Sequence, residues 1–487
     1  MDSIKIFSRD QLHPVSPAHN RRYEGTGRVS VAPALIEATM YSSSKSPLPP
    51  YLGRDWQCCI HPEGKPYFYR QAQFTVVTEA PIYNPAVASC LNGWLAFIEE
   101  AISDLHFVVS VTAELWLEID KNTGHCNYYF VDHATRAIFW LENIETEVLD
   151  LPGSVSHSHL KYALEENYWN HVETYPMHLE GLPTGALDEL IIIFMHARAD
   201  QMTSTSSTFP YTKEECVAFL DLLSHSRDEV SDGRVITYVA RLWTVVSNFR
   251  FITHYGEEHC RLSRNQSIIE SPEPKKSIAL NLTSTVLFNL PKAHQERLED
   301  LFVDDLVYRA NWQAFISNLT AEWKLCMQWT FALLMCNALT TSHVPSIGLT
   351  QSSMALCIAG LIFSTVLSHQ HQHLERIDTG EAASYLSDRR TATGFRPLAI
   401  VYSLPKALFV WALVLFAIQA ACMAFCSMPF PCFVLSVSVV AAASVAVWRT
   451  ITPRPARFEP EAESGGLEST WSSGLLTLHK QVEQIEA

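Results

Sequence analysis

The sequence predicts a multi-domain membrane protein: small antiparallel β units first, a mostly α-helical cytosolic domain next, and a C-terminal bundle of α-helical transmembrane segments. Three observations predict this. Aromatic residues cluster twice in the N-terminal third, amphipathic periodicity dominates the middle, and charged residues are nearly absent from long stretches after Trp323. A chain of 487 residues also exceeds what one hydrophobic core usually serves, so several domains are expected.

Composition argues against some partners and compartments. The formal net charge is −16, from 51 acidic and 35 basic side chains, and no long Lys/Arg tract offsets it. Binding of nucleic acid through its phosphates is therefore not expected. The N-terminus has no apolar stretch of signal-peptide length, which disfavours secretion by a cleaved signal, and the 12 cysteines, with no CxxC, are expected to be reduced thiols.

Four segments are predicted in the first 145 residues. Residues 1–46 mix Pro, Ser, Arg and His without periodicity, which predicts a disordered tail. The aromatic clusters at 47–82 and 111–145 each predict a small β unit. Between them, residues 83–110 carry apolar side chains at spacings of three and four, which indicates a helical connector.

Residues 156–320 predict a mostly α-helical cytosolic domain. In the stretch KEECVAFLDLLSH the apolar residues fall on one helical face, and Thr212 with Glu215 has the spacing of a capping box. Helices of this kind bury one apolar stripe and leave the rest in water.

Four apolar stretches are long enough to be spans, because a bilayer requires about 20 apolar residues per helix. They lie at 325–342, 346–367, 404–426 and 430–448. The first is the weakest, since it is short and contains Gln328 and Asn337.

Arginines predict how these spans are oriented. They occur in the loop 368–398 and in the tail 449–487, whereas the two short turns between paired spans have none. The positive-inside rule then predicts a multi-pass protein with both termini in the cytosol. If the first stretch only lies on the surface, the number of spans is odd and the tail crosses the membrane against its arginines.

The most specific motif is the stretch YYFVDHATRAIFW, which ends at Trp140. Together with Trp116 and Gly124 upstream, it resembles the WW domain, a three-stranded sheet that binds proline-rich peptides. Such a groove suits polyproline helices, which are preformed and lose little entropy on binding. The peptide-binding residues implied by the resemblance are Tyr129, Val131, His133, Arg136 and Trp140.

In this resemblance Tyr129 and Trp140 clasp prolines, and the other three residues receive the tyrosine of a PPxY-type peptide. Two features depart from the family. The gap from Gly124 to Tyr129 is longer than usual, and Asn143 stands where a proline is expected. The alternative is that Tyr129 and Trp140 only pack against neighbouring helices.

The earlier cluster resembles only the first half of the family pattern. Gln71 replaces the histidine and Thr78 replaces the second tryptophan, so proline clasping should fail there. We interpret this copy as structural. The structural aromatic residues of the two clusters are then Trp56, Tyr67, Phe68, Trp116 and Phe130.

The segment from Leu48 to Tyr51 reads LPPY and is similar to the LPxY ligands of WW domains. It could occupy the groove of the second cluster within the same chain. It could equally be a linker, or place a proline on Trp56.

The overall arrangement resembles multi-pass WW-domain-containing proteins of mushroom-forming (agaricomycete) fungi, a resemblance that implies architecture but no activity. The function predicted is a membrane-anchored, non-enzymatic module that binds proline-rich segments at the cytosolic face. The alternative is that the aromatic rings are purely structural and that an unknown activity, enzymatic or of the membrane bundle, resides in the helical or transmembrane region.

No catalytic, cofactor or metal site is predicted. The motifs GxxxxGK[ST], GxGxxG, GxSxG and HExxH do not occur. The histidines at 369–373 suggest a solvated helix end close to the membrane. Glu165, Glu166, His171 and His178 are close enough for a helical acid/base site, yet suit a solvated face equally well.

Overall fold

The computed structural model describes residues 7–19, 28–33, 35, 55–120, 123–204, 206–270, 274–275, 277–341 and 347–451. It forms two compact units. The first comprises Met1–Phe331 with Ala359–Phe409, and the second comprises Ala332–Ile358 with Val410–Ala487.

The two aromatic clusters fold into one sheet rather than two separate units. The first gives β2 (Trp56–Ile60), β3 (Pro66–Gln71) and β4 (Thr75–Thr78), and the second gives β5 (Ala113–Ile119), β6 (Cys126–Asp132) and β7 (Ala137–Phe139). Each is an antiparallel meander, and β4 pairs with β5 in parallel. A parallel pair needs a crossover, and α1 (Pro85–Asp104) within the predicted connector supplies it.

Part of the predicted disordered tail belongs to this sheet, so that prediction is wrong for these residues. Strand β1 (Leu12–Pro14) pairs in parallel with the first half of β6, while β7 pairs with the second half along the same edge. Three residues are too few for periodicity to signal a strand, and the proline is tolerated because β1 lies at the edge.

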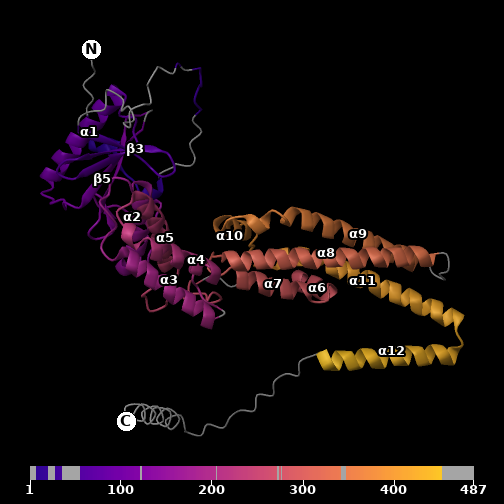
Figure 1. Cartoon of the computed structure of the whole chain (residues 1–487). Helices are drawn as coiled ribbons and strands as arrows, with labels where there is room; N and C mark the ends of the chain where they lie inside the picture. The colour runs from indigo at the N-terminus through magenta and orange to yellow at the C-terminus, as the bar shows by residue number, and fades with distance from the viewer. Residues whose placement is uncertain are drawn as a thin grey trace, which may run out of the picture. The chain divides into compact units, whose positions relative to one another are not determined.

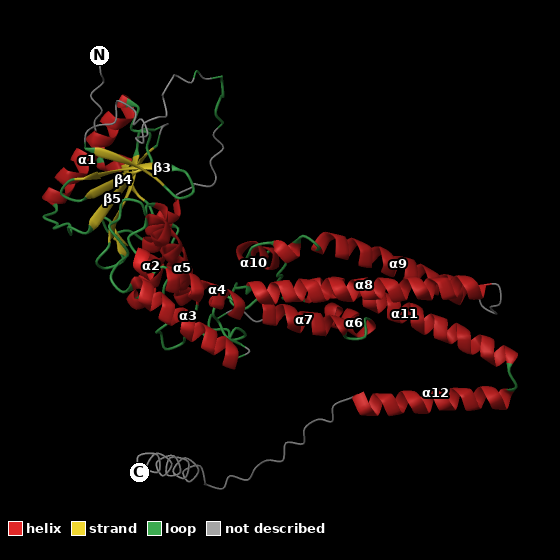
Figure 2. Ribbon diagram, viewed as in Figure 1, coloured by secondary structure: helices red, strands yellow, loops and turns green. Residues whose placement is uncertain are grey.

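Alternation of side chains along the strands gives the sheet two cores. On one face Leu115, Leu117 and Phe130 pack with Trp94 of α1. On the other face Trp116, Tyr129 and Val131 share a core with residues of α2 (His157–Thr174) and α5 (Gly233–Ile252). Figure 2 shows the strands with α1 on one side and α2 and α5 on the other. The face that a WW-like unit would leave open is therefore covered by helices.

The predicted domain 156–320 contributes to two different cores. Helices α2, α3 (Ala186–Thr203), α4 (Lys213–His225) and α5 pack with the sheet, and Thr212 with Glu215 forms the predicted capping box at α4. Helix α7 (Leu290–Leu301), which follows α6 (Ile278–Val286), packs instead with α8 (Arg309–Thr340) and α10 (Thr379–Ser387).

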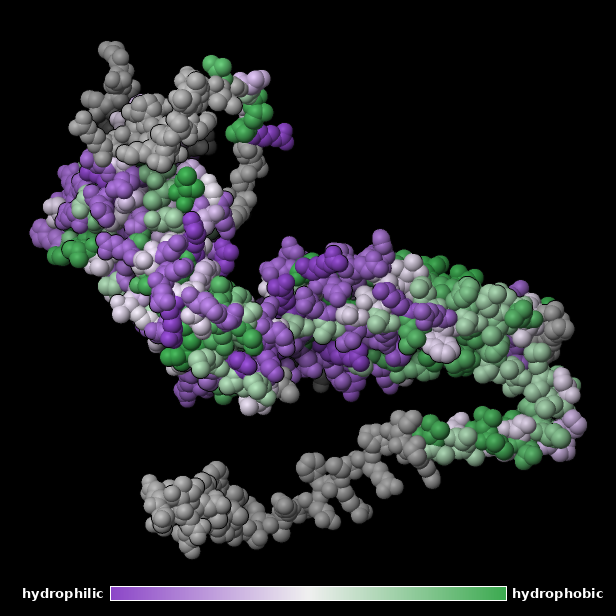
Figure 3. Space-filling model, in the orientation of Figure 1, coloured by the Kyte–Doolittle hydropathy of each residue, from purple (hydrophilic) through white to green (hydrophobic). Residues whose placement is uncertain are grey.

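Three helices in the described part of the chain are long and apolar enough to cross a membrane. The first is Ile347–Arg376, whose main part is α9 (Ile347–His371). The second is α11 (Arg396–Ser427), and the third is the part of α12 (Phe430–Ile451) that ends at Val447. Figure 1 locates them, and Figure 3 shows that the visible surface of α12 is largely hydrophobic. The apolar half of α8, the predicted first span, is not among them. The turn at 342–346 and the tail from 452 lie outside the described residues.

Polar side chains connect helices of the second unit. The Asn337 side-chain amide donates to Ser353 Oγ at 3.1 Å, and Thr350 Oγ1 donates to Gln419 Oε1 at 3.0 Å. In an apolar environment such bonds hold helices together because the groups would otherwise be unsatisfied. Asn337, which weakens the predicted first span, thus finds a partner inside this unit.

Candidate functional site

The two central residues of the predicted peptide site are buried. Tyr129 is 1% and Val131 0% exposed. The ring of Tyr129 stacks on Trp116, with centroids 4.9 Å apart, and its hydroxyl shares a hydrogen bond of 3.0 Å with Nδ1 of His171 in α2. Helix α2 therefore occupies the place where a peptide would lie on Tyr129.

His133 and Arg136 follow β6 and bind neighbouring elements. His133 Nδ1 shares a hydrogen bond of 3.0 Å with the Tyr168 hydroxyl. Arg136 donates to Glu189 Oε2 at 2.8 Å and to the Thr184 carbonyl at 3.3 Å. Both side chains thus have partners within the chain.

Trp140 lies at the edge of the sheet and is partly buried. Its indole N–H donates to the Val15 carbonyl at 2.9 Å, just after β1. The segment that contacts Trp140 is therefore the one between Pro14 and Pro17. The other candidate, Leu48 to Tyr51, lies outside the described residues.

The predicted structural aromatic residues are all buried, but they divide between the two faces of the sheet. Tyr67 and Trp116 belong to the core under α2. The residues packed on the α1 side are Trp56, Phe68 and Phe130.

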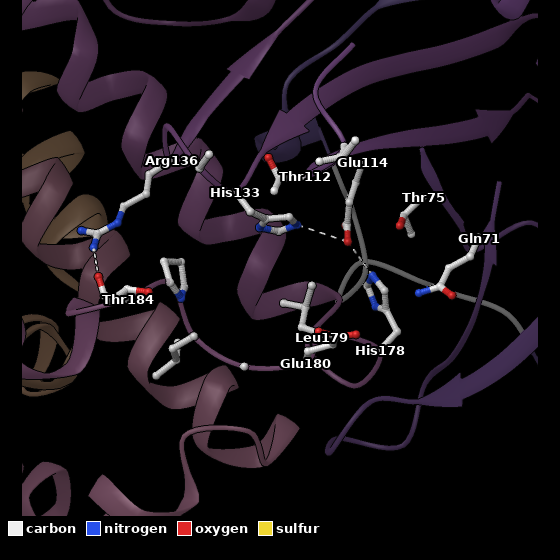
Figure 4. Close-up of a pocket in the computed structure, with 15 residues that line it drawn as sticks. Gln71, Thr75, Thr112, Glu114, His133, Arg136, His178, Leu179, Glu180 and Thr184 are labelled. Carbon is white, nitrogen blue, oxygen red and sulfur yellow. Dashed lines mark hydrogen bonds and ion pairs between the residues drawn. The ribbon is translucent and has the colours of Figure 1, made fainter. Parts of the chain in front are cut away.

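The sheet β1–β7 and the helices α1–α5 that pack on it are called the sheet domain below. The most unusual group in its described part is Glu114, which belongs to none of the sequence motifs. It lies on β5 beneath α2 and is 3% exposed. Three imidazoles surround its carboxylate through their Nε2 atoms, those of His171 at 2.9 Å, His178 at 2.8 Å and His133 at 3.2 Å. They come from α2, from the loop after α2 and from the turn after β6 (Figure 4 shows His133 and His178 beside Glu114).

Each imidazole is held at its other nitrogen by a tyrosine. Nδ1 of His171 bonds Tyr129, Nδ1 of His178 bonds Tyr67 at 3.1 Å, and Nδ1 of His133 bonds Tyr168. Three Tyr–His–Glu chains thus converge on one carboxylate. Nε2 of His133 differs from the other two, because its angle to Glu114 does not satisfy a hydrogen bond although the atoms are close.

Electrostatics within the cluster favour an ionised carboxylate. Burial alone would raise the pKa of Glu114, but the imidazoles of His178 and His133 outweigh it and hold the pKa well below its usual value. Burial lowers the pKa of His171 and outweighs the opposite effect of Glu114. At neutral pH the cluster therefore contains a Glu114 carboxylate and a neutral His171.

A cavity of about 780 Å³ lies beside this cluster. Its polar lining includes Glu114, Gln71, Thr75, Thr112, His133 and His178, and the main chain from 179 to 184 closes one side. In Figure 4 the side chain of Arg136 extends away from Glu114 toward Thr184. The cavity thus presents hydroxyl, amide and imidazole groups beside a buried carboxylate, and the charged side chains of Arg136 and Glu180 also belong to its lining.

No group of three or more His, Cys, Asp or Glu side chains is arranged to hold a metal ion within the described residues. In the Glu114 cluster the Nε2 atoms of His171 and His178 bond the carboxylate and that of His133 lies 3.2 Å from it, so they do not surround a shared empty position.

The histidines at 369–373 match the expected solvated helix end at His369 and His373, which are exposed, but not at His371. His371 is buried, its Nδ1 bonds the Leu367 carbonyl at 2.9 Å and its Nε2 bonds the Tyr402 hydroxyl at 3.1 Å. A neighbouring helix provides the buried partner, and the local sequence does not reveal it.

Comparison with known proteins finds no matching family model, no matching curated protein and no matching solved structure. The WW-domain resemblance therefore remains a prediction from the sequence motifs of the two clusters.

Proposed function

We propose that the chain is a membrane-anchored binding protein that holds a small, polar, neutral ligand in the cavity beside Glu114. The observation that supports this is a carboxylate, 3% exposed, ringed by three imidazoles at the wall of a cavity of about 780 Å³. Burying a charge is costly, and perturbed titratable groups beside cavities are typical of functional sites.

Ligand binding fits this geometry better than catalysis. A general base needs a lone pair within reach of a substrate proton, but both ring nitrogens of His171 and His178 already bond Glu114 or a tyrosine. Nε2 of His133 makes no hydrogen bond within the described residues, yet it lies 3.2 Å from the Glu114 carboxylate, which occupies the position a substrate proton would need. A neutral ligand fits because Arg136 is already paired with Glu189, the Glu114 carboxylate is surrounded by imidazoles, and the remaining charged residue of the lining, Glu180, is exposed to water. Its hydroxyl or amide groups would bond Gln71, Thr75 and Thr112.

The anchor is the C-terminal region. Three helices are apolar enough to span, and we propose that α8 from Leu325 onward is a fourth. Its exposed side chains there are large and apolar, including Trp329, Phe331 and Leu339. With four spans, the sheet domain and both termini lie in the cytosol.

Titration calorimetry on the full chain in nanodiscs tests the ligand site, with a panel of neutral monosaccharides and small amides as probes. We expect at least one probe to bind, and Gln71→Leu to weaken it because Gln71 lines the cavity. Gln73→Leu is the matched control, since Gln73 is exposed two residues away and is not part of the lining. Absence of binding across the panel, or equal affinity in both variants, would reject the proposal.

A second candidate is recognition of proline-rich segments through Tyr129, Val131, His133, Arg136 and Trp140. It is favoured by one observation: the Trp140 indole already donates to Val15, between Pro14 and Pro17. A partner segment would replace this part of the chain, and it would reach Tyr129 only if α2 left the sheet.

Titration of PPxY and LPxY peptides into the full chain and into a variant lacking residues 1–17 tests this second candidate. Binding should be stronger in the truncated chain and should be lost in Trp140→Ala. Peptides that bind neither chain would eliminate it.

A further inference from the structure

Helix α6 (Ile278–Val286) carries an apolar stripe on its outer side. Ile278 is 88% and Leu282 66% exposed, and they lie four residues apart on one helical face, which Val286 continues. The opposite face packs inward through Leu280, Ser284 and the following Leu287. No residue of α6 itself is buried. A helix whose larger apolar side chains point away from the protein has its main apolar contact elsewhere.

The position of α6 indicates what that contact is. The Asn281 side-chain oxygen accepts a hydrogen bond of 3.3 Å from Arg396, the first residue of α11. Ile400, one turn further along α11, lines a cavity of about 420 Å³ together with residues of α6 and α7. Helix α6 is therefore attached to the start of a helix that is apolar enough to span a membrane.

Charged residues show where the apolar part of these helices begins. Lys324 is the last charged residue of α8 and Lys406 the last of α11. Lys406 also pairs with Glu322 of α8 at 2.7 Å, so the charged part of each helix ends, and the apolar part begins, at the same level. Ile400 precedes Lys406 by six residues, about 9 Å along a helix, a distance comparable with the thickness of the lipid headgroup layer.

We propose that α6 is an interfacial helix that inserts Ile278 and Leu282 among the lipids at the cytosolic membrane surface. This inference rests on the membrane anchoring proposed above. An interfacial helix lies in the plane of the membrane with its apolar side turned into the boundary between headgroups and acyl chains. The stripe of α6 faces away from the protein and is therefore free to enter the bilayer, while Asn281, Lys292 and Arg396 are left at headgroup level.

Such a contact would give the domain a second attachment to the bilayer besides the spanning helices. The spans fix only their own depth, whereas a surface helix beside α11 also restrains the tilt of the elements that pack on α7 and α8. Water is a poor alternative environment, because each exposed apolar side chain costs free energy in proportion to its area.

The test uses the full chain in phosphatidylcholine nanodiscs that contain nitroxide-labelled lipids. An environment-sensitive fluorescent amino acid is placed at Leu282 or, as the matched control, at the neighbouring exposed residue Thr283. We expect blue-shifted emission and severalfold stronger quenching at position 282 than at position 283. Water-like emission with equal, weak quenching at both positions would overturn the proposal.

A third probe position separates this inference from the anchoring on which it rests. Leu435 is 67% exposed on the candidate span of α12. Quenching at 435 without quenching at 282 would refute the role of α6 and leave the anchoring intact. Absence of quenching at both positions would refute both.

Discussion

At the scale of single residues, the stability of the sheet domain depends on Glu114. Its two oxygens face three imidazoles, and a glutamine there would turn an N–H group toward at least one ring N–H. We predict that Glu114→Gln lowers the free energy of unfolding by about 3 to 5 kcal/mol, because the buried partners lose their counterpart. Denaturation of the full chain in detergent, followed by hydrogen exchange in α2, measures it.

The control for that variant is Glu189→Gln. Glu189 is the exposed partner of Arg136, with about half of its side chain accessible, so its loss should cost less than about 1 kcal/mol. Equal losses in the two variants would mean that the Glu114 cluster contributes nothing beyond an ordinary surface ion pair.

The same cluster predicts acid lability. Burial puts the pKa of His171 below the ordinary 6.5, so the unfolded chain binds more protons and stability falls as pH decreases below about 6.5. The pKa of Glu114 is also lowered, so its contribution is present above about 4.5 and disappears as pH falls through the folded value. Glu166 on the same helix titrates in the opposite sense, so the comparison is made in a Glu166→Gln background. There we expect α2 to open more readily at pH 5.5 than at pH 7.5, measured by hydrogen exchange in detergent after correction for the intrinsic pH dependence of exchange. Equal opening at both values would contradict this assignment of charges.

Glu166 on α2 predicts the opposite dependence. Burial raises its pKa from 4.5 to about 7, so the folded chain favours the protonated form and stability falls as pH rises through this range. At pH 8, Glu166→Gln should stabilise by roughly 1 to 3 kcal/mol, nearer the lower value because the side chain is only partly buried. At pH 4 the two chains should unfold together, and thermal scans at both pH values test this. A variant that is no more stable at pH 8 would show that water reaches the carboxylate.

Local sequence indicates which face of a strand each side chain occupies, but not which residues of other elements it contacts. Alternation of side chains along a strand is enough to put Tyr129 and Val131 on one face of β6 and Phe130 on the other. The Glu114 cluster could not be anticipated, because its partners His171 and His178 follow 57 and 64 residues later and are brought together only by packing of α2 on the sheet.

At the scale of elements, β1 is the segment most open to experiment. It supplies one edge of β6, and the Val15 amide donates to the Tyr128 carbonyl at 3.1 Å. Removing residues 1–17 should therefore speed amide exchange along residues 126–128, because their outer hydrogen bonds pass to water. Hydrogen exchange of the full and shortened chains in detergent measures it, with β2 at the other edge as the internal reference. Unchanged exchange at 126–128 would mean that this pairing adds no protection.

Helix α1 shows how much of an element its own sequence determines. Apolar spacing predicted a helix within 83–110, and the structure has one at Pro85–Asp104. Its role as a crossover between two fused meanders was not predictable, since that depends on β4 meeting β5, about 40 residues away in sequence. Each meander alone has three strands and a marginal core. In the fused sheet, both meanders contribute residues to the core on each face.

At the scale of the whole molecule, the sequence predicted four spanning stretches; three of the described helices are apolar enough to span by length and composition, and α8 is not among them. In α8 the amide of Asn337 lowers the apolar character of the stretch, yet it donates to Ser353 within the second unit. Composition counts every polar side chain as a cost, whereas a paired one costs little. Whether α8 spans therefore has to be decided by topology.

The two possibilities place the C-terminus on opposite sides of the membrane. With four spans it lies beside the N-terminus in the cytosol, as the arginines at 449, 454 and 457 favour, and with three it lies across the bilayer. We predict that protease added to sealed microsomes removes tags from both termini without detergent. The sequons at Asn265, Asn281 and Asn318 should also show no mobility shift with an endoglycosidase. Protection of the C-terminal tag alone would show that α8 stays on the surface. Glycosylation at any of the three asparagines would place the sheet domain in the lumen, and the ligand cavity beside Glu114 would then face a different compartment.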